Sequence, residues 1–125
     1  MTRILVADDV LDAAESLSSL FRALGHDTFI AVDGGQAVEA VRVNRPQIVF
    51  LDLDMPVLTG YQAAQAIRQE HQQPPPFLIA LTASHGMAVE VATKAVGFDA
   101  YIRKPGDTYA LIAMVTDLSQ RNCAS

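Results

Sequence analysis

The chain of 125 residues lacks the features that mark secreted, membrane and thiolate-metal proteins. Its single cysteine, Cys123, excludes a disulfide framework and a thiolate metal cluster, and we expect it to be an incidental surface thiol. No stretch approaches the roughly 18 consecutive apolar residues that a membrane span requires. The apolar run after Arg3 is too short to be a signal peptide. These absences predict a cytoplasmic chain without a membrane partner.

Positive charge and glycine-rich phosphate loops are scarce as well. Nine Lys and Arg stand against fourteen Asp and Glu, which gives a net charge of −5 and disfavours direct, sequence-independent binding to nucleic acid. The chain contains no Gly-x-x-x-x-Gly-Lys loop, and no Gly-x-Gly-x-x-Gly follows its first apolar run. A P-loop nucleotide site is therefore excluded, and a dinucleotide-binding fold is disfavoured.

Apolar residues, by contrast, make up half of the chain and alternate between two kinds of segment. Short apolar runs predict strands, and segments with a period near 3.6 predict helices. Gly25 and Gly97 are expected to end the first and fourth helices, and the second should finish before Pro46. The predicted strands are 4–7, 28–32, 47–51, 77–81 and 99–102, and the predicted helices begin near residues 12, 34, 61, 85 and 107.

At least four of these strands are apolar throughout, which is typical of strands covered on both faces. The alternation predicts one α/β domain over residues 1–125, a doubly wound five-stranded parallel sheet with five helices and no separate output domain.

Polar side chains follow the predicted strands at the points where they end. Asp8 and Asp9 follow the first strand, Asp52 the third, Thr82 the fourth and Lys104 the fifth. The carboxyl ends of parallel strands share one edge of the sheet, where ligands bind in open α/β folds. Three carboxylates and one ammonium leave a formal charge of −2 there, which a divalent cation would offset. Oxygen ligands without cysteine or a well-placed histidine favour Mg²⁺ or Mn²⁺.

This set of groups is suited to handling a phosphoryl group. A cation and Lys104 can neutralise the phosphoryl oxygens, Thr82 can donate a hydrogen bond, and Asp52 can attack phosphorus. Asp8 and Asp9 could instead form only a turn and a helix start, where aspartate is favoured. That alternative explains Asp52 poorly, because burying a charge at a strand end is costly.

The chain resembles a response regulator receiver domain over essentially its whole length. Each matching segment is modest alone, but the four together, in this order and spacing, are specific. They are Ile4-Leu5-Val6-Ala7-Asp8-Asp9, Leu51-Asp52-Leu53-Asp54-Met55-Pro56 with Gly60, Leu81-Thr82-Ala83, and Tyr101-Ile102-Arg103-Lys104-Pro105.

The resemblance implies a flavodoxin-like fold and a role in two-component phosphorelay signalling. Asp52 would accept a phosphoryl group from a phosphohistidine on a sensor histidine kinase or a histidine phosphotransfer protein. Asp8, Asp9, Asp52 and the backbone carbonyl of Asp54 would bind Mg²⁺.

In the same family pattern, Lys104 and Thr82 would contact the phosphoryl group, and Thr82 with Tyr101 would form the switch. The Lys104–Pro105 peptide bond would be cis. The face of the fourth helix, fifth strand and fifth helix would then bind a downstream protein target or a domain of a parent chain. Such a protein catalyses its own phosphotransfer and dephosphorylation but turns over no external substrate.

Several side chains are left open or given simpler roles. The carboxylate of Asp54 is either incidental or a modulator of phosphoryl lifetime, as is Ser84. Gly106 stands where receivers commonly carry an apolar residue, which loosens the expected entry to the last helix. Three histidines are expected at the surface and two methionines in packing, namely His26, His71 and His85, and Met87 and Met114.

Two other functions compete with this interpretation. Residues 49–54 resemble the Asp-x-Asp loop of haloacid-dehalogenase-type phosphatases, but Pro56 stands where that loop usually has Thr or Val. The acidic pair also precedes the nucleophile strand, and the chain has no room for a cap. The third possibility is a receiver that signals by protein contact without phosphorylation.

Overall fold

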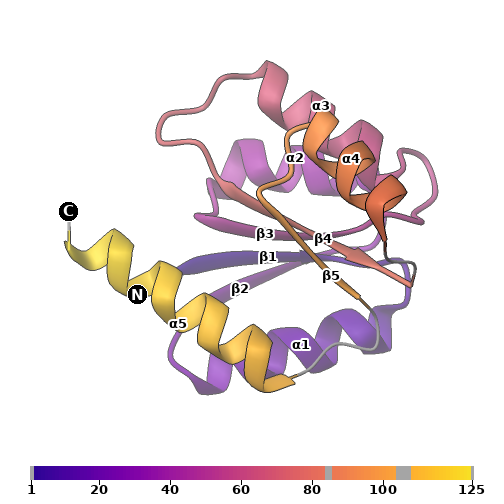
Figure 1. Ribbon diagram of the computed structural model, residues 1–125. Helices are drawn as coiled ribbons and strands as arrows, with labels where there is room; N and C mark the ends of the chain where they lie inside the picture. The colour runs from indigo at the N-terminus through magenta and orange to yellow at the C-terminus, as the bar shows by residue number, and fades with distance from the viewer. Residues whose placement is uncertain (1, 84–85, 104–107, 125) are drawn as a thin grey trace.

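Strands and helices alternate along the chain in the computed structural model, which describes residues 2–83, 86–103 and 108–124 (Figure 1). The order and type of the ten predicted elements are confirmed, with ends that differ by a few residues. The elements are β1 Arg3–Ala7, α1 Leu11–Ala23, β2 Asp27–Ala31, α2 Gly34–Asn44, β3 Ile48–Asp52, α3 Gly60–Gln69, β4 Phe77–Thr82, α4 Met87–Ala95, β5 Ala100–Arg103 and α5 Thr108–Ala124.

The five described strands form one parallel sheet in the order β2-β1-β3-β4-β5. Ala7 of β1 pairs with Leu51 of β3, and Asp52 of β3 pairs with Leu81 of β4. The chain runs outward in one direction from β1 to β2 and in the other from β3 to β5. The boundary between β1 and β3 is therefore the switch point of a doubly wound sheet, beside which α/β proteins place their ligands.

Helices cover both faces of the sheet, α1 and α5 on one and α2, α3 and α4 on the other (Figure 1). The central strands are buried on both sides, so successive residues enter different cores. Along β1, Ile4 and Val6 pack with α1 and α5, while Leu5 and Ala7 pack with α2 and α3. This arrangement explains why the strands are apolar without alternation.

Glycines mark the helix ends where the backbone takes a left-handed conformation. Gly25 after α1 has φ 92° and Gly97 after α4 has φ 101°, as predicted for helix stops. The predicted start of α4 at His85 was wrong, because the helix begins at Met87 after Gly86. Gly86 has φ 118°, which no helix interior accommodates.

Two of the simpler placements predicted from sequence were also wrong. His26 is half-buried rather than exposed, and its Nδ1 has no hydrogen-bond partner among the described residues. Met87 is 80% exposed, whereas Met114 packs with the α1 and α5 core as expected. His71 is exposed.

Thr2, just before β1, shares a hydroxyl–hydroxyl hydrogen bond with Ser119 of α5, at 2.5 Å between the two oxygens. The start of β1 is thus joined to the last helix. Within the described residues, no helix is both long and apolar enough to cross a membrane.

Candidate functional site

Asp8 and Asp9 follow β1 directly. The amide of Asp8 donates to the carbonyl of Ala31 at the end of β2, at 3.0 Å. The Oδ1 atom of Asp8 accepts from the amide of Val10, also at 3.0 Å, so the carboxylate closes a turn at the strand end. Asp8 is buried and Asp9 is exposed. One carboxylate of the pair is fixed against the sheet, and the other faces solvent.

Asp52 is the last residue of β3 and only 6% exposed. Its Oδ1 accepts a hydrogen bond from the amide of Asp54 at 3.1 Å. Because β1 and β3 are neighbours, the carboxylates of Asp8, Asp9 and Asp52 each offer an oxygen within 4.8 Å of the others. The side chain of Asp54 is exposed and does not belong to this cluster.

The carboxylate cluster has the chemistry of a site for a hard cation. Three negative charges this close repel one another, and burial of two of them removes part of the screening by water. A divalent cation would offset the repulsion, and oxygen donors are the ligands that Mg²⁺ and Mn²⁺ prefer. Asp8, Asp9 and Asp52 could therefore hold a metal ion, with the exposed Asp9 on the solvent side.

The loop after β3 folds back tightly over the end of that strand. The amide of Gly60 donates to the carbonyl of Leu53 at 3.1 Å. A Cβ atom at residue 60 would lie 2.5 Å from the carbonyl oxygen of Asp52, closer than real contacts allow. Thr59 and Gln62 then close a capping box that starts α3. Gly60 is needed for this close approach, whereas the sequence suggested it only as a turn residue.

Thr82 and Tyr101 lie on the strands beyond β3. Thr82 ends β4 and is buried, one residue after the Leu81 that pairs with Asp52. Tyr101 lies in β5, half-buried against the core beneath α2, α3 and α4. The remaining predictions lie outside the described residues: the Lys104 side chain, the Lys104–Pro105 cis bond, Gly106, Ser84 and His85, as does the side chain of Cys123.

Residues 4–116 match the sequence profile of the response regulator receiver domain. The chain belongs to this family. Receivers are signalling domains of two-component systems, and the predicted fold class and family are confirmed.

DNA-binding response regulators are among the similar curated proteins. MtrA of Mycolicibacterium paratuberculosis is 38% identical over 120 residues, which cover 96% of this chain and 52% of MtrA. The transcriptional regulatory protein PrrA of Mycobacterium bovis is 35% identical, over 95% of this chain and 50% of PrrA. The receiver therefore spans about half the length of the curated relatives it matches.

Solved receiver structures superpose closely on this one. The receiver domain of the Francisella response regulator 1452 gives a TM-score of 0.88 at 28% identity, covering 98% of this chain and 99% of that one. The chemotaxis protein CheY4 of Vibrio cholerae gives 0.87, covering 94% and 98%, and at 24% identity it supports the fold alone.

Sequence reasoning missed how the receiver's second helix supports the loop after β3. The amide of Gly34, the first residue of α2, donates to the carbonyl of Pro56 at 3.3 Å. A Cβ atom at residue 34 would lie 2.1 Å from the carbonyl oxygen of Leu58. Asp33-Gly34-Gly35 was predictable only as a turn. The close approach depends on a residue more than twenty positions away, which no local pattern indicates.

Proposed function

We propose that this receiver takes a phosphoryl group onto Asp52 from a phosphohistidine of a sensor histidine kinase or a histidine phosphotransfer protein. The observation that carries the proposal is the placement of Asp52, buried at a strand end with the Asp8 and Asp9 carboxylates beside it. Burial shields this nucleophile from water, and the exposed Asp9 lies beside it. The family membership agrees with this chemistry.

The transfer joins an oxygen of Asp52 to phosphorus as the phosphorus–nitrogen bond of the donor breaks. The bonding electron pair leaves with the imidazole nitrogen. The departing imidazole is neutral because it keeps one ring proton or takes one up. Bound Mg²⁺ would supply positive charge for the phosphoryl oxygens. Asp8 and Asp9 would hold that ion, with Asp52 and the backbone carbonyl of Asp54 as further ligands.

Thr82 and Lys104 are proposed to bind the phosphoryl group once it is on Asp52. Thr82 supports this role by its place at the end of the neighbouring strand β4. The Thr82 hydroxyl would donate to a phosphoryl oxygen, and the Lys104 ammonium would pair with another.

The signal would pass to the face formed by α4, β5 and α5. A phosphoryl group favours one of two states only through contacts that differ between them. Thr82 and Tyr101 are the proposed contacts, because Thr82 lies beside the acceptor and Tyr101 lies half-buried on the next strand. The recipient would be a downstream protein or another domain of the same chain.

Mass spectrometry of the intact chain tests the acceptor. With acetyl phosphate or a phosphorylated kinase, and with Mg²⁺, we expect one phosphate per chain. Omitting Mg²⁺ or replacing Asp52 by Ala should abolish the addition, whereas Asp54→Ala should retain it, because the metal ligand proposed at Asp54 is its backbone carbonyl. Equal incorporation by Asp52→Ala would overturn the acceptor assignment. Failure with both donors would favour a receiver that signals by contact alone.

A further inference from the structure

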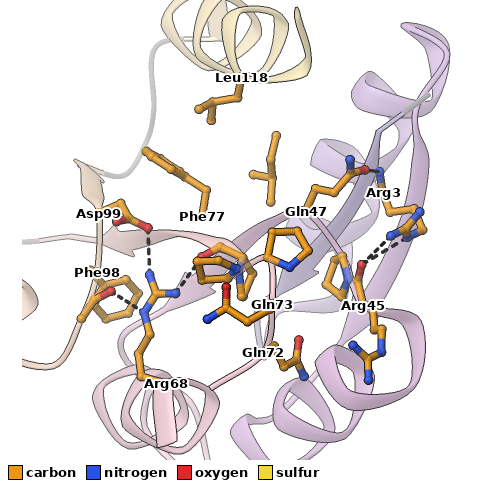
Figure 2. A pocket seen from close by; sticks show the side chains of 16 residues that line it. Arg3, Arg45, Gln47, Arg68, Gln72, Gln73, Phe77, Phe98, Asp99 and Leu118 are labelled. Atoms are coloured by element: carbon orange, nitrogen blue, oxygen red, sulfur yellow. Dashed lines mark hydrogen bonds and ion pairs between the residues drawn. The ribbon is translucent and has the colours of Figure 1, made fainter. Parts of the chain in front are cut away.

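A second concave site lies at the opposite end of the sheet from the carboxylate cluster. A cavity of about 830 Å³ opens at the amino ends of the strands, where Arg3, Ile48 and Phe77 begin β1, β3 and β4 (Figure 2). Ile48 and Asp52 are four residues apart along β3, a separation of about 13 Å. The cavity is therefore distinct from the proposed phosphorylation site.

The lining of this cavity is basic, although the whole chain is acidic. Three arginines, Arg3, Arg45 and Arg68, lie around it with one aspartate, Asp99, which leaves a formal charge of +2 among the described lining residues. The net charge of the chain is −5. A local reversal of charge in a concave site favours an anionic ligand.

All three guanidinium nitrogens of Arg68 donate hydrogen bonds within the fold. Its Nε donates to the carbonyl of Gly97 at 2.9 Å, its Nη1 to the carbonyl of Pro76 at 2.8 Å, and its Nη2 to the carboxylate of Asp99 at 2.8 Å. Figure 2 shows these contacts at one side of the cavity. Arg68 therefore has a structural role in the lining, and its position is explained without a bound ligand.

Arg3 is only partly used. Its Nε donates to the carbonyls of Asn44 and Arg45, both at 3.2 Å, and its Nη2 donates to Arg45 at 2.9 Å. These bonds satisfy carbonyls at the end of α2, where a cation is favourable. The Nη1 group of Arg3 has no hydrogen-bond partner among the described residues.

Arg45 has no such structural role for its side chain. It is the C-cap of α2 with φ 47°, a left-handed position that favours glycine or asparagine. Its guanidinium is exposed and has no acceptor among the described residues. Its side chain lies on the same side of the cavity as Arg3 (Figure 2). Arg45 therefore offers a free, bidentate donor at the rim.

The backbone N–H groups of Arg3, Phe77 and Leu78 already donate hydrogen bonds within the fold, so they are not available to a ligand. The amide of Arg3 donates to Oε1 of Gln47, and the amide of Phe77 to the carbonyl of Gln47, both at 2.9 Å. The amide of Leu78 donates to Asp99 at 2.9 Å. A ligand would be held by side chains, with the Gln73 amide as a further polar group in the lining.

Much of the remaining lining is apolar, although Gln47 and Gln72 also belong to it. Pro74, Pro75, Pro76, Phe77 and Leu118 contribute to the apolar part, and Phe77 and Leu118 also pack against the core beneath α1 and α5. A volume of about 830 Å³ lies within the range of small-molecule sites and far exceeds a lone inorganic anion. Guanidinium planes also stack on aromatic rings.

We propose that this cavity binds a small aromatic anion of about nucleotide size, with its phosphate or carboxylate group on Arg45 and within the positive field of Arg3. The ring system would lie against residues 74–77. The site is independent of the proposed phosphorylation, so the Asp52→Ala protein should bind the same ligand equally well.

Titration with 1-naphthyl phosphate, followed by amide chemical shifts in NMR spectra, tests this site. We expect saturable shifts at Arg3, Arg45, Gln47 and Phe77, and weaker binding of inorganic phosphate and of 1-naphthol. Equal affinity for inorganic phosphate would reduce the site to an ion site, and equal affinity for 1-naphthol would reduce it to an apolar groove. Either result overturns the proposal.

Three variants that each lower the net charge by one distinguish a direct contact with the ligand from a general effect of net charge on binding. Arg45→Gln and Gln73→Glu should each weaken binding about tenfold, the loss expected for one charge-assisted contact. Arg42→Gln is the control, because Arg42 contacts Glu39 and Glu70 away from the cavity. The affinity of this variant for 1-naphthyl phosphate should stay within about twofold of the wild-type value. An equal loss in all three would contradict a built site.

Discussion

Gly60 illustrates how little space a single residue has beside the carboxylate cluster. In Gly60→Ala the new Cβ would lie 2.5 Å from the Asp52 carbonyl oxygen and 2.7 Å from the Leu53 Cα, so backbone has to move. We expect a loss of about 1–3 kcal/mol in the free energy of unfolding, measured by urea denaturation. Phosphate incorporation should also slow, because Asp52 is displaced.

Gly35→Ala provides the matched control for that change. A Cβ atom at Gly35 would meet only side-chain atoms, Asp33 Oδ1 at 3.3 Å and Val57 Cγ1 at 3.4 Å. Alanine also favours a helix over glycine by about 0.5–1 kcal/mol. A neutral or slightly stabilising effect is expected, and equal destabilisation by both changes would argue against the close approach at Gly60.

His26 makes a second residue-scale contribution, to the pH dependence of stability. Burial, and then the positive charge of the chain's amino end, lower the pKa of His26 from its usual value of 6.5. The unfolded chain therefore binds the proton more readily than the folded one. The free energy of unfolding should fall as the pH drops below 6.5 towards the folded-state pKa, and His26 adds no pH dependence well above 6.5.

Urea denaturation at about pH 7.5 and about pH 5.5 measures this effect on either side of the histidine titration. The wild type should lose more stability over this interval than His26→Gln, in which the titrating group is absent. The two proteins differ only at residue 26, so other contributions to the pH dependence cancel in the difference. Equal losses in the two proteins would show that His26 titrates as it does in the unfolded chain.

At the scale of elements, Arg68 joins α3 to the segments around β4 and β5. Its three donors reach Gly97, Pro76 and Asp99, and its side chain is only 26% exposed. Arg68→Ala leaves three acceptors to water, and we expect a loss of about 2 kcal/mol after allowing for partial solvation. Arg68→Lys should recover only part, because an ammonium cannot reproduce the planar fork.

Arg42→Ala is the comparison for Arg68 in the same denaturation experiment. Arg42 links α2 to α3 through Glu70 and also contacts Glu39, but its side chain is 54% exposed. Water and salt screen such a pair, so its loss should cost clearly less than that of Arg68. A larger effect at Arg42 would contradict the ranking by burial.

The elements themselves were predictable because each carries its signal locally. The apolar run before Asp52 and the stop at Gly25 depend on neighbouring residues alone, and both follow from strand and helix geometry. The contacts of Arg68 do not, because its acceptors Pro76 and Gly97 are brought to it only by the packing of α3. Half-burial of His26 likewise depends on how α1 turns into β2, which its short-range pattern leaves open.

For the molecule as a whole, Mg²⁺ should stabilise the folded state. At ten times its dissociation constant, an ion that binds only the folded chain adds about 1.4 kcal/mol to the free energy of unfolding. Asp9→Asn should lose most of this gain, because Asp9 belongs to the carboxylate cluster. Asp54→Asn should keep it, since the Asp54 side chain is exposed and its backbone is unchanged. Thermal melts with increasing Mg²⁺ make the comparison, and equal gains in the two variants would contradict the assigned ligands.

The convergence of the carboxylates was predictable in outline, since parallel strands share one carboxyl edge. Its detail depends on strand order, which places β1 beside β3 and so brings Asp8 within reach of Asp52. The basic cavity at the other edge could not be predicted, because it requires Arg3 and Arg45 to meet across β1 and the end of α2. Nothing in the local sequence around either arginine indicates that meeting.

The strand order also has a consequence in time. Asp8 and Asp52 become neighbours only when β1 pairs with β3, and the chain between them forms α1, β2 and α2. Binding of an ion to these carboxylates would require contacts that span 44 residues. We therefore expect the ion to stabilise the assembled sheet and not the transition state for folding. Mg²⁺ should then lower the unfolding rate constant and leave the folding rate constant nearly unchanged. The same carboxylates that prepare the domain for its signal would prolong the lifetime of its native state.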